Sequence, residues 1–274
     1  MSLRKTDQTK RTVSVYRVNF IFGIAQILSL ITPAYITTPS SMVSKTSTGM
    51  QKNLFSKTLF SALLTIGLIA PASAKARNIA VGLRGGSAGV GGEVTIGLLS
   101  KLNFRSGLNF FSYDGSGKES ETEYDYTVKL RSVPLLLDYH PFDNGFKVTS
   151  GIFINNSKVT GVAQPEGMML NIGGIEYEIL DIGDVNGKID FRKTSPYVGI
   201  GWGNALNKSS TVKITVDIGV LFQGKPNVTL EPTIDTSLIP GFDDSLEKES
   251  ADLKKDLEYL QYYPVVSAGV AYSF

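Results

Sequence analysis

The sequence is poor in the residues that build disulfides and metal sites. Its 274 residues include no cysteine and a single histidine, His140. The absence of cysteine excludes disulfide bonds, iron–sulfur clusters and thiolate zinc sites. Charged residues make up only 19%, yet aromatic residues reach 10%, a composition that excludes global disorder. We therefore expect a folded protein without a metal site or a cofactor.

Net positive charge is confined to the N-terminal region. Residues 1–74 hold eight of the 27 lysine and arginine residues but only one of the 25 acidic residues, Asp7. The remaining 200 residues carry 19 bases against 24 acids. This acidic balance predicts no nucleic-acid partner.

A second start lies inside the chain at Met50. Lys52 and Lys57 are followed by the apolar segment 59–70, and Ala72 and Ala74 place small residues where signal peptidase requires them. The apolar segment has about a dozen residues, fewer than the roughly 20 of a membrane-spanning helix. We predict that residues 50–74 are a cleaved signal peptide and that residues 75–274 form the mature domain.

Residues 1–49 have two interpretations. The apolar segment 20–36 follows a basic flank and has the features of a signal anchor. Alternatively, residues 1–49 are an upstream extension that precedes the true start at Met50. We favour the extension, because two export signals in tandem would be redundant.

A period of two dominates the chain from Asn78 onward. Between residues 212 and 223, one face is apolar throughout and the other is mainly polar or small; the apolar positions are Val212, Ile214, Val216, Ile218, Val220 and Phe222. This length matches the 9–11 residues of a tilted strand that crosses a bilayer. The alternation recurs and predicts eight strands, over residues 78–86, 90–99, 102–113, 125–139, 146–158, 191–205, 211–223 and 259–274. The predicted fold is all-β, an eight-stranded antiparallel transmembrane up-and-down β-barrel.

Short turns and long polar connections alternate between these strands, as in membrane barrels with periplasmic turns and outer loops. The long connections are 114–123, 159–190 and 225–258, and residues 114–125, 166–190 and 231–258 hold 20 of the 24 acids. The last loop contains an apolar stripe at helical spacing, formed by Leu246, Leu253, Leu257 and Leu260. We predict a short helix there that packs on the barrel mouth, with Asp243, Asp244 and Ser245 as candidate N-caps.

The face opposite the apolar positions carries nine charged residues that we predict to line the lumen: Arg84, Glu93, Arg105, Lys129, Arg131, Asp138, Lys147, Lys213 and Asp217. Lys129 and Arg131 differ in parity from Asp138, so all three point inward only with a bulge near residues 132–134. The nine residues either line a solute path that selects by charge or form a salt-bridged plug. Six bases against three acids would make the lumen mainly positive.

Sequence motifs for catalysis are absent. His140 has Asp138 and Asp143 nearby in sequence but no nucleophile motif such as G-x-S-x-G accompanies it. The sequence therefore predicts that the protein is not an enzyme.

Four stretches of the sequence resemble small outer-membrane barrels of Gram-negative bacteria. They are residues 81–94, 195–206, 217–230 and 256–274. The nearest resemblance is to the carbapenem-susceptibility-associated outer-membrane proteins, which are proposed to conduct ornithine and other basic amino acids. The resemblance implies an outer-membrane location, eight strands and a helical element in the last loop. Val270, Tyr272 and Phe274 resemble the signal that the barrel-assembly machinery reads.

From these features we predict a narrow porin-like channel for small, cationic, amino-acid-like solutes. Its partners would be outer-membrane lipid, the barrel-assembly machinery and those solutes. The alternative is a closed structural or surface-interaction barrel that transports nothing.

Overall fold

The structure, a computed structural model, describes residues 78–119, 122–142, 144–165, 169–206 and 210–274. The predicted upstream extension and signal peptide, residues 1–74, lie outside the described residues.

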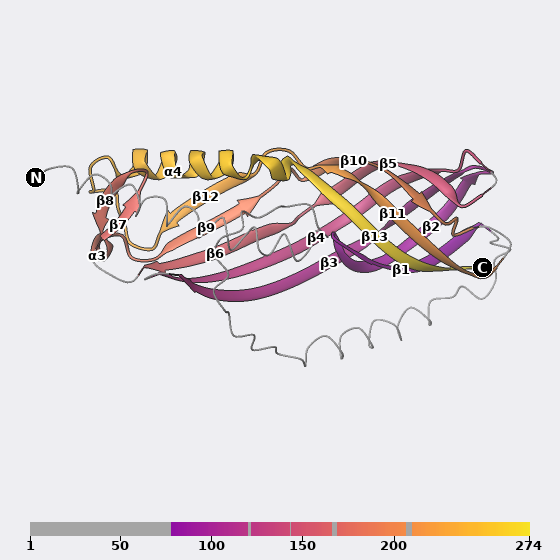
Figure 1. Ribbon diagram of the computed structural model, residues 1–274, viewed down its shortest axis with the longest axis horizontal. Coiled ribbons are helices and arrows are strands. Elements are labelled where there is room, and N and C mark those ends of the chain that lie inside the picture. The colour runs from indigo at the N-terminus through magenta and orange to yellow at the C-terminus, as the bar shows by residue number, and fades with distance from the viewer. Residues whose placement is uncertain (1–77, 120–121, 143, 166–168, 207–209) are drawn as a thin grey trace, which may run out of the picture. The chain divides into compact units, whose positions relative to one another are not determined.

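Eight antiparallel strands close into a barrel, as the sequence predicts. Around the ring their order is β4-β3-β2-β1-β13-β11-β10-β5, and pairing of β5 with β4 completes the closure (Figure 1). The first and last strands join along a seam that runs from Ala80 opposite Ser273 to Gly86 opposite Ser267. The strands are β1 (Ile79–Gly86), β2 (Gly89–Leu99), β3 (Leu102–Glu119), β4 (Thr122–Tyr139), β5 (Phe146–Asn155), β10 (Thr194–Trp202), β11 (Val212–Phe222) and β13 (Tyr262–Ser273).

Strand alternation places large apolar side chains on the outside of the barrel. On β11, Val212, Ile214, Val216 and Ile218 are 46–73% exposed, whereas Asp217 between them is 2% exposed. We call the outward apolar side chains of the barrel strands the apolar belt. Its members include Val94, Ile96, Leu108, Phe110, Leu137, Val148, Val198, Ile200, Val212, Ile214, Val216, Ile218 and Val270. The barrel is thus inverted relative to a soluble protein, with apolar groups outside and charges inside.

The three predicted loops are largely ordered into strands and helices, which corrects the expectation of long polar connections. Beyond the barrel, β3 and β4 continue, and β6 (Lys158–Pro165), β9 (Val185–Asp190) and β12 (Asn227–Pro232) pair beside them in the order β4-β6-β9-β12. Strand β6 continues β5 in the same register on β4. We call this end of the barrel distal and the opposite end proximal. We call the distal parts of β3 and β4 together with β6, β9 and β12 the extended sheet.

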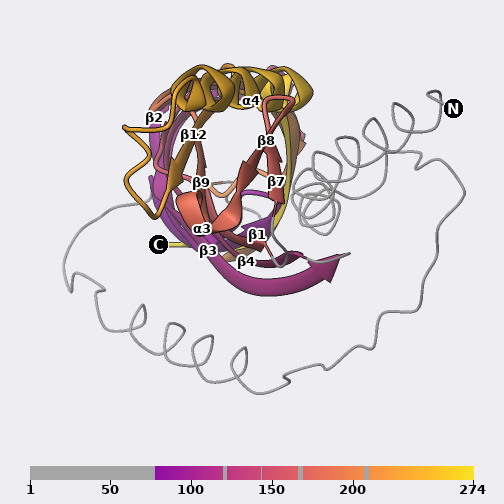
Figure 2. The ribbon, with the colours of Figure 1, turned by 90° about the vertical axis from the view of Figure 1, so that its left-hand side faces the viewer.

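The predicted helix of the last loop exists and covers the inner face of the extended sheet. It comprises α4 (Phe242–Asp256), followed by the 3-10 turn η1 (Glu258–Gln261). Leu253, Leu257 and Leu260 from the predicted stripe pack against Ile189 and Val228 of the sheet. Figure 2 shows α4 lying across the strands of this region. Among the described residues, no helix combines the length and apolarity needed to cross a bilayer.

The predicted N-caps of α4 are wrong. The N-cap is Gly241, whose φ of 75° is left-handed, and Asp243 and Asp244 instead lie in the first turn. There their negative charges favourably oppose the positive end of the helix dipole. Glycine occupies the cap because it adopts this backbone conformation without a steric cost.

A smaller hairpin lies next to the start of α4. It consists of β7 (Met169–Ile172) and β8 (Ile175–Glu178), followed by the single-turn α3 (Ile179–Ile182). Ile172, Tyr177 and Ile182 pack with Phe242 at the start of α4, and the rings of Tyr177 and Phe242 meet edge to face at 5.0 Å.

Strand β4 has no bulge at residues 132–134, so that prediction is wrong. Its register with β3 is the same on both sides of Pro134, as it is with β5 and β6. Regular alternation then puts Ser132 and Asp138 inside and Arg131 outside. Lys129, two residues from Arg131, faces the same way. Neither Lys129 nor Arg131 lines the interior.

Candidate functional site

The barrel interior gathers six of the nine predicted residues into one buried cluster. Each comes from a strand of the ring: Arg84, Glu93, Arg105, Asp138, Lys147 and Asp217. Their side chains are at most 10% exposed. Three bases face three acids, so the cluster is formally neutral and not mainly positive as the sequence suggested. We call it the interior ion-pair network.

Two arginine forks organise this network. Arg84 donates to Glu93 through Nε at 2.7 Å and through Nη2 at 3.1 Å. Arg105 binds Asp138 in the same manner, with Nε at 2.7 Å and Nη2 at 3.0 Å. Such bidentate pairs combine charge attraction with a fixed geometry, and they are among the strongest hydrogen bonds in proteins. The forks therefore hold β1 to β2 and β3 to β4 at one level of the barrel.

Asp217 and Lys147 connect the forks across the lumen. Asp217 pairs with Arg84, with Lys147 Nζ at 2.9 Å and with Arg105 Nη2 at 3.4 Å. Thr149 donates to Asp138 at 2.7 Å, and Arg84 donates to Ser267 at 2.8 Å. An isolated buried charge costs several kcal/mol, so this mutual pairing is what allows six ionised groups to stay inside.

A glycine of β10 leaves the space that the network fills. A Cβ at Gly201 would lie 2.7 Å from Asp217 Oδ1 and 2.7 Å from Lys147 Cε. Thr149, Ser267 and Gly201 were not predicted as site residues. Thr149 has the same parity as Lys147 on β5, whereas Gly201 and Ser267 alternate with the outward apolar residues of β10 and β13. This parity is the signal that would have identified them.

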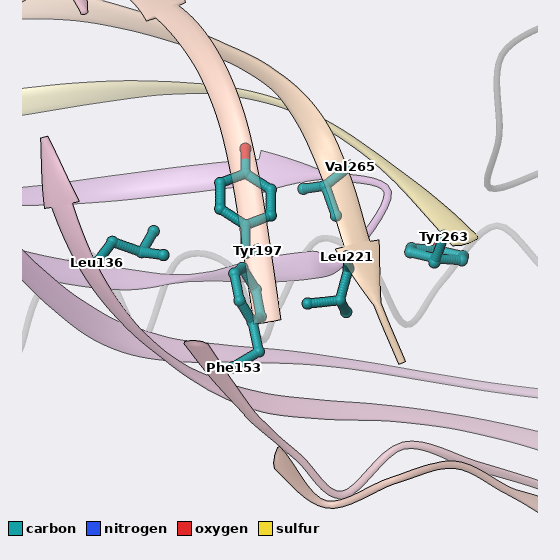
Figure 3. Packing of buried hydrophobic residues seen from close by; sticks show 6 residues of the cluster. All are labelled: Leu136, Phe153, Tyr197, Leu221, Tyr263 and Val265. Carbon is teal, nitrogen blue, oxygen red and sulfur yellow. The ribbon is translucent and has the colours of Figure 1, made fainter. Parts of the chain in front are cut away.

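A layer of apolar side chains fills the barrel on the distal side of the network. It comprises Leu136, Phe153, Tyr197, Leu221, Tyr263 and Val265, drawn in Figure 3. The rings of Phe153 and Tyr197 lie 5.3 Å apart. We call this set the apolar layer.

The β1–β2 turn folds inward over the apolar layer. Ala88 packs against it, and Ser87 O accepts a hydrogen bond from Tyr263 Oη at 2.7 Å. Ser87 Oγ in turn donates to Pro264 O at 3.0 Å. The turn thereby adds its own atoms to the filling of the interior.

A small cavity separates the apolar layer from the helix. It has a volume of about 60 Å³ and is lined in part by Ser132, Asn155 and Gln223. Asn155 Nδ2 donates to Gln223 Oε1 at 3.3 Å, and Gln223 Nε2 donates to Leu260 O at 2.9 Å. Above it, α4 and η1 pack on the extended sheet. The interior is thus built of successive charged, apolar and mixed layers.

The remaining predicted site residues lie apart from the network. Lys213 is partly exposed at the proximal end of β11, where its Nζ donates to Ser210 O at 2.6 Å. Val270, Tyr272 and Phe274 face outward beside the barrel seam, and the rings of Tyr272 and Phe274 meet edge to face at 5.3 Å. Lys129 lies outside on β4, next to Arg131, as described above.

His140 is buried at the proximal end of the interior. Its Nε2 lies 3.2 Å from Asn103 Nδ2, and among the described residues its Nδ1 has no hydrogen-bond partner. Its partner is an amide, whereas histidine-dependent hydrolysis uses a hydroxyl nucleophile and an orienting carboxylate.

Comparison with known proteins gives similarity at the level of solved structures. No family model and no curated protein matches the chain. CarO2 and CarO of Acinetobacter baumannii each share 18% identity with it, over 72% of this chain and 98% of theirs, with TM-scores of 0.49 and 0.48. A major outer membrane protein from Thermus thermophilus shares 13% identity over 72% of this chain and 98% of its own, with a TM-score of 0.37. The chain is thus similar to outer-membrane proteins of the kind that the sequence resemblance named.

Proposed function

We propose that the protein is an outer-membrane β-barrel that is closed to solutes and holds the extended sheet at the cell surface. The observation that carries the proposal is the interior ion-pair network lying beneath the apolar layer. Each contains side chains from several strands around the ring, so the two together fill successive levels of the barrel.

The membrane location is supported by the inverted distribution of side chains. The apolar belt occupies strands of lengths that suit a tilted crossing, such as the 11 residues of β11. Aromatic side chains border the belt: Tyr139, Trp202, Tyr272 and Phe274 at the proximal end, and Phe222 and Tyr262 at the distal end. Such aromatic girdles are typical of the two interfaces of a membrane barrel. Short proximal turns and the large distal extension favour an orientation with the extended sheet outside the cell.

Closure is supported by the side chains that fill the interior, because a solute could pass only by displacing them. Eight strands enclose an interior that side chains just fill. A path would require the forks on Glu93 and Asp138 to separate and the apolar layer to part. Breaking a buried pair typically costs about 3–5 kcal/mol, so an open state would be rarely populated without a compensating ligand.

A narrow channel for cationic solutes is the second candidate. The three interior carboxylates, Glu93, Asp138 and Asp217, favour it, because they have the sign that binds an ammonium group. In the closed arrangement each is already paired with an arginine or with Lys147.

Conductance of the refolded full chain in planar bilayers separates the two functions. For a closed barrel we expect no unitary conductance, and no uptake of lysine or ornithine into proteoliposomes, under conditions where a general porin conducts. Lysine uptake that falls in Asp217→Asn but not in Lys213→Gln would contradict closure and favour the channel.

Surface display is tested with an epitope inserted next to Leu238, which is 92% exposed in the distal region. We expect antibody to bind intact cells, and the protein to fractionate with the outer membrane. Recovery in the soluble periplasmic fraction would exclude the membrane location.

A further inference from the structure

The outer face of the extended sheet carries exposed bases immediately beyond the apolar belt. Lys129 of β4 lies opposite Lys158 of β6, and Arg131 lies two residues closer to the belt on β4. Asn156 N–H donates to Arg131 O and Asn155 N–H to Lys193 O, which puts Arg192 at the level of Arg131. We call Lys129, Arg131, Lys158 and Arg192 the basic band. Arg131, Lys158 and Arg192 are exposed, and none of the four forms an ion pair with another described residue. By contrast, the neighbouring Lys188 and Lys225 pair with Asp190 and Glu258, each at 2.7 Å.

The position of the basic band relative to a bilayer follows from its distance to the apolar belt along the same strands. Val133 and Ile154, which face each other on β4 and β5, lie on the same face as Arg131, and Val133 is two residues from Arg131 along β4. Two residues of a strand span about 7 Å. The band therefore stands where a bilayer changes from acyl chains to headgroups.

A groove opens directly beyond the band on the same face. Its volume is about 630 Å³, and it takes outward side chains from five strands, including Asp114, Asp125, Thr127, Thr160, Lys188, Thr229 and Glu231. Thr127 and Thr160 are two residues distal to Lys129 and Lys158 on their strands. Figure 2 shows the distal parts of β3 and β4 sweeping away from the barrel.

We propose that this face binds a phosphorylated glycolipid of the outer leaflet. The acyl chains would lie along the apolar belt, the phosphates on the basic band, and the sugar in the groove. The inference rests on the proposed membrane location but not on closure of the interior.

Each layer suits one part of that lipid. Guanidinium groups such as those of Arg131 and Arg192 donate paired hydrogen bonds to phosphate oxygens, and the lysines add positive charge. The groove offers threonine hydroxyls and the carboxylates of Asp125 and Glu231, which accept hydrogen bonds from sugar hydroxyls. A soluble phosphate compound would use the band but would leave the adjoining belt unused, so a lipid accounts for the continuity of the three layers.

The test measures lipid binding to the refolded full chain in detergent by native mass spectrometry. The probes are lipid A, its dephosphorylated form and phosphatidylglycerol. The band variant combines Arg131→Gln, Lys158→Gln and Arg192→Gln. The matched control combines Lys248→Gln, Lys254→Gln and Lys255→Gln, which remove the same charge from exposed positions of α4.

For the wild type we expect lipid A to bind more tightly than either other probe. Each base near a charged surface contributes about fivefold, so the band variant should lose roughly 100-fold for lipid A while the control variant matches wild type. The groove variant Asp125→Asn with Glu231→Gln should weaken lipid A binding without affecting phosphatidylglycerol.

Equal losses in the band and control variants, or equal binding of dephosphorylated lipid A, would overturn the proposal. So would phosphatidylglycerol binding as tightly as lipid A. Insertion of the wild type into phosphatidylcholine vesicles is measured in parallel. If it inserts but does not select lipid A, the glycolipid site fails alone; if it does not insert, the membrane location fails with it.

Discussion

Asp217 pairs with all three bases of the interior ion-pair network, Arg84, Arg105 and Lys147. Asp217→Asn would leave three bases against two acids in a site where Asp217 is only 2% exposed. Removing one partner of a buried ion pair typically costs about 3–5 kcal/mol. We expect a loss of this size in the free energy of unfolding, measured by urea titration in lipid vesicles. The matched change Asp181→Asn, at an exposed position of α3, should leave the unfolding midpoint in place. Equal midpoints for both variants would refute the structural role of Asp217.

Gly201 provides a second test at the residue scale, because it separates packing from charge. An added Cβ would lie 2.6 Å from Val216 O and 2.7 Å from Lys147 Cε. We expect Gly201→Ala to destabilise the barrel by about 1–3 kcal/mol, as overpacked sites commonly do. At Gly117 of β3 an added Cβ has no neighbour within 4 Å. Gly117→Ala is therefore the control. If the unfolding midpoint of Gly201→Ala were as high as that of Gly117→Ala, the tight packing around the network would be contradicted.

At the scale of elements, the barrel strands could be predicted because each one alternates over enough residues to fix its face. Asp217 on β11 and Glu93 on β2 were assigned to the interior by parity alone. The prediction is wrong for Lys129 and Arg131, because it requires every charge on these strands to face the lumen and needs a bulge that β4 lacks. The regular ladder instead places both on the outer face.

The extended sheet could not be predicted from the same pattern. Strands β9 and β12 have six residues each, and their inner positions include Gly187. With so few apolar positions, they do not differ from polar loops by sequence alone. Their inner face is buried only because α4 covers it, and that contact is tertiary. The helix stripe was predictable, whereas the surface that it covers was not.

Leu257 tests the dependence of the extended sheet on the helix. It is fully buried, at 0% exposure, between η1 and the sheet. Leu257→Ala should cost about 2–5 kcal/mol and loosen the distal region. We expect faster proteolytic cleavage within residues 227–256, mapped by mass spectrometry, with the barrel strands still protected. Leu238→Ala changes the same residue type at 92% exposure and should cleave at the wild-type rate. Unchanged cleavage in Leu257→Ala would show that the sheet is ordered without the helix.

The end of β13 is the element that we propose the barrel-assembly machinery recognises. Phe274 N–H donates to Ile79 O at 3.2 Å, so the last residue also contributes to closing the seam. Deleting Phe274 should reduce insertion into the outer membrane while leaving export to the periplasm intact. Phe142→Ala removes another exposed aromatic side chain from the same end of the barrel and serves as the control. Normal insertion of the truncated chain, measured by fractionation, would exclude a role for Phe274.

At the scale of the whole molecule, one alternation rule produces four chemically distinct surfaces. Inward positions of the barrel form the interior ion-pair network and the apolar layer. Outward positions form the apolar belt within the barrel and the basic band beyond it. The change from apolar to basic occurs where β5 passes into β6 without a change of register. In the proposed membrane location, a single continuous sheet would meet both the lipid interior and its headgroups.

Closure of the ring predicts resistance to detergent. Within the ring every strand is paired on both sides, so sodium dodecyl sulfate finds no unpaired backbone there from which to begin unfolding. We expect the unheated protein to migrate as a compact, fast band on electrophoresis and to shift to its full apparent mass only on boiling.

A temperature series then links this behaviour to the interior: Asp217→Asn should shift at a lower temperature than wild type, because the network stabilises all the strands it joins. The band variant, whose substitutions are exposed, should shift with wild type. Identical mobility before and after boiling would contradict the closed barrel. A shift temperature in Asp217→Asn equal to that of wild type would show that the network is not what stabilises the barrel against detergent.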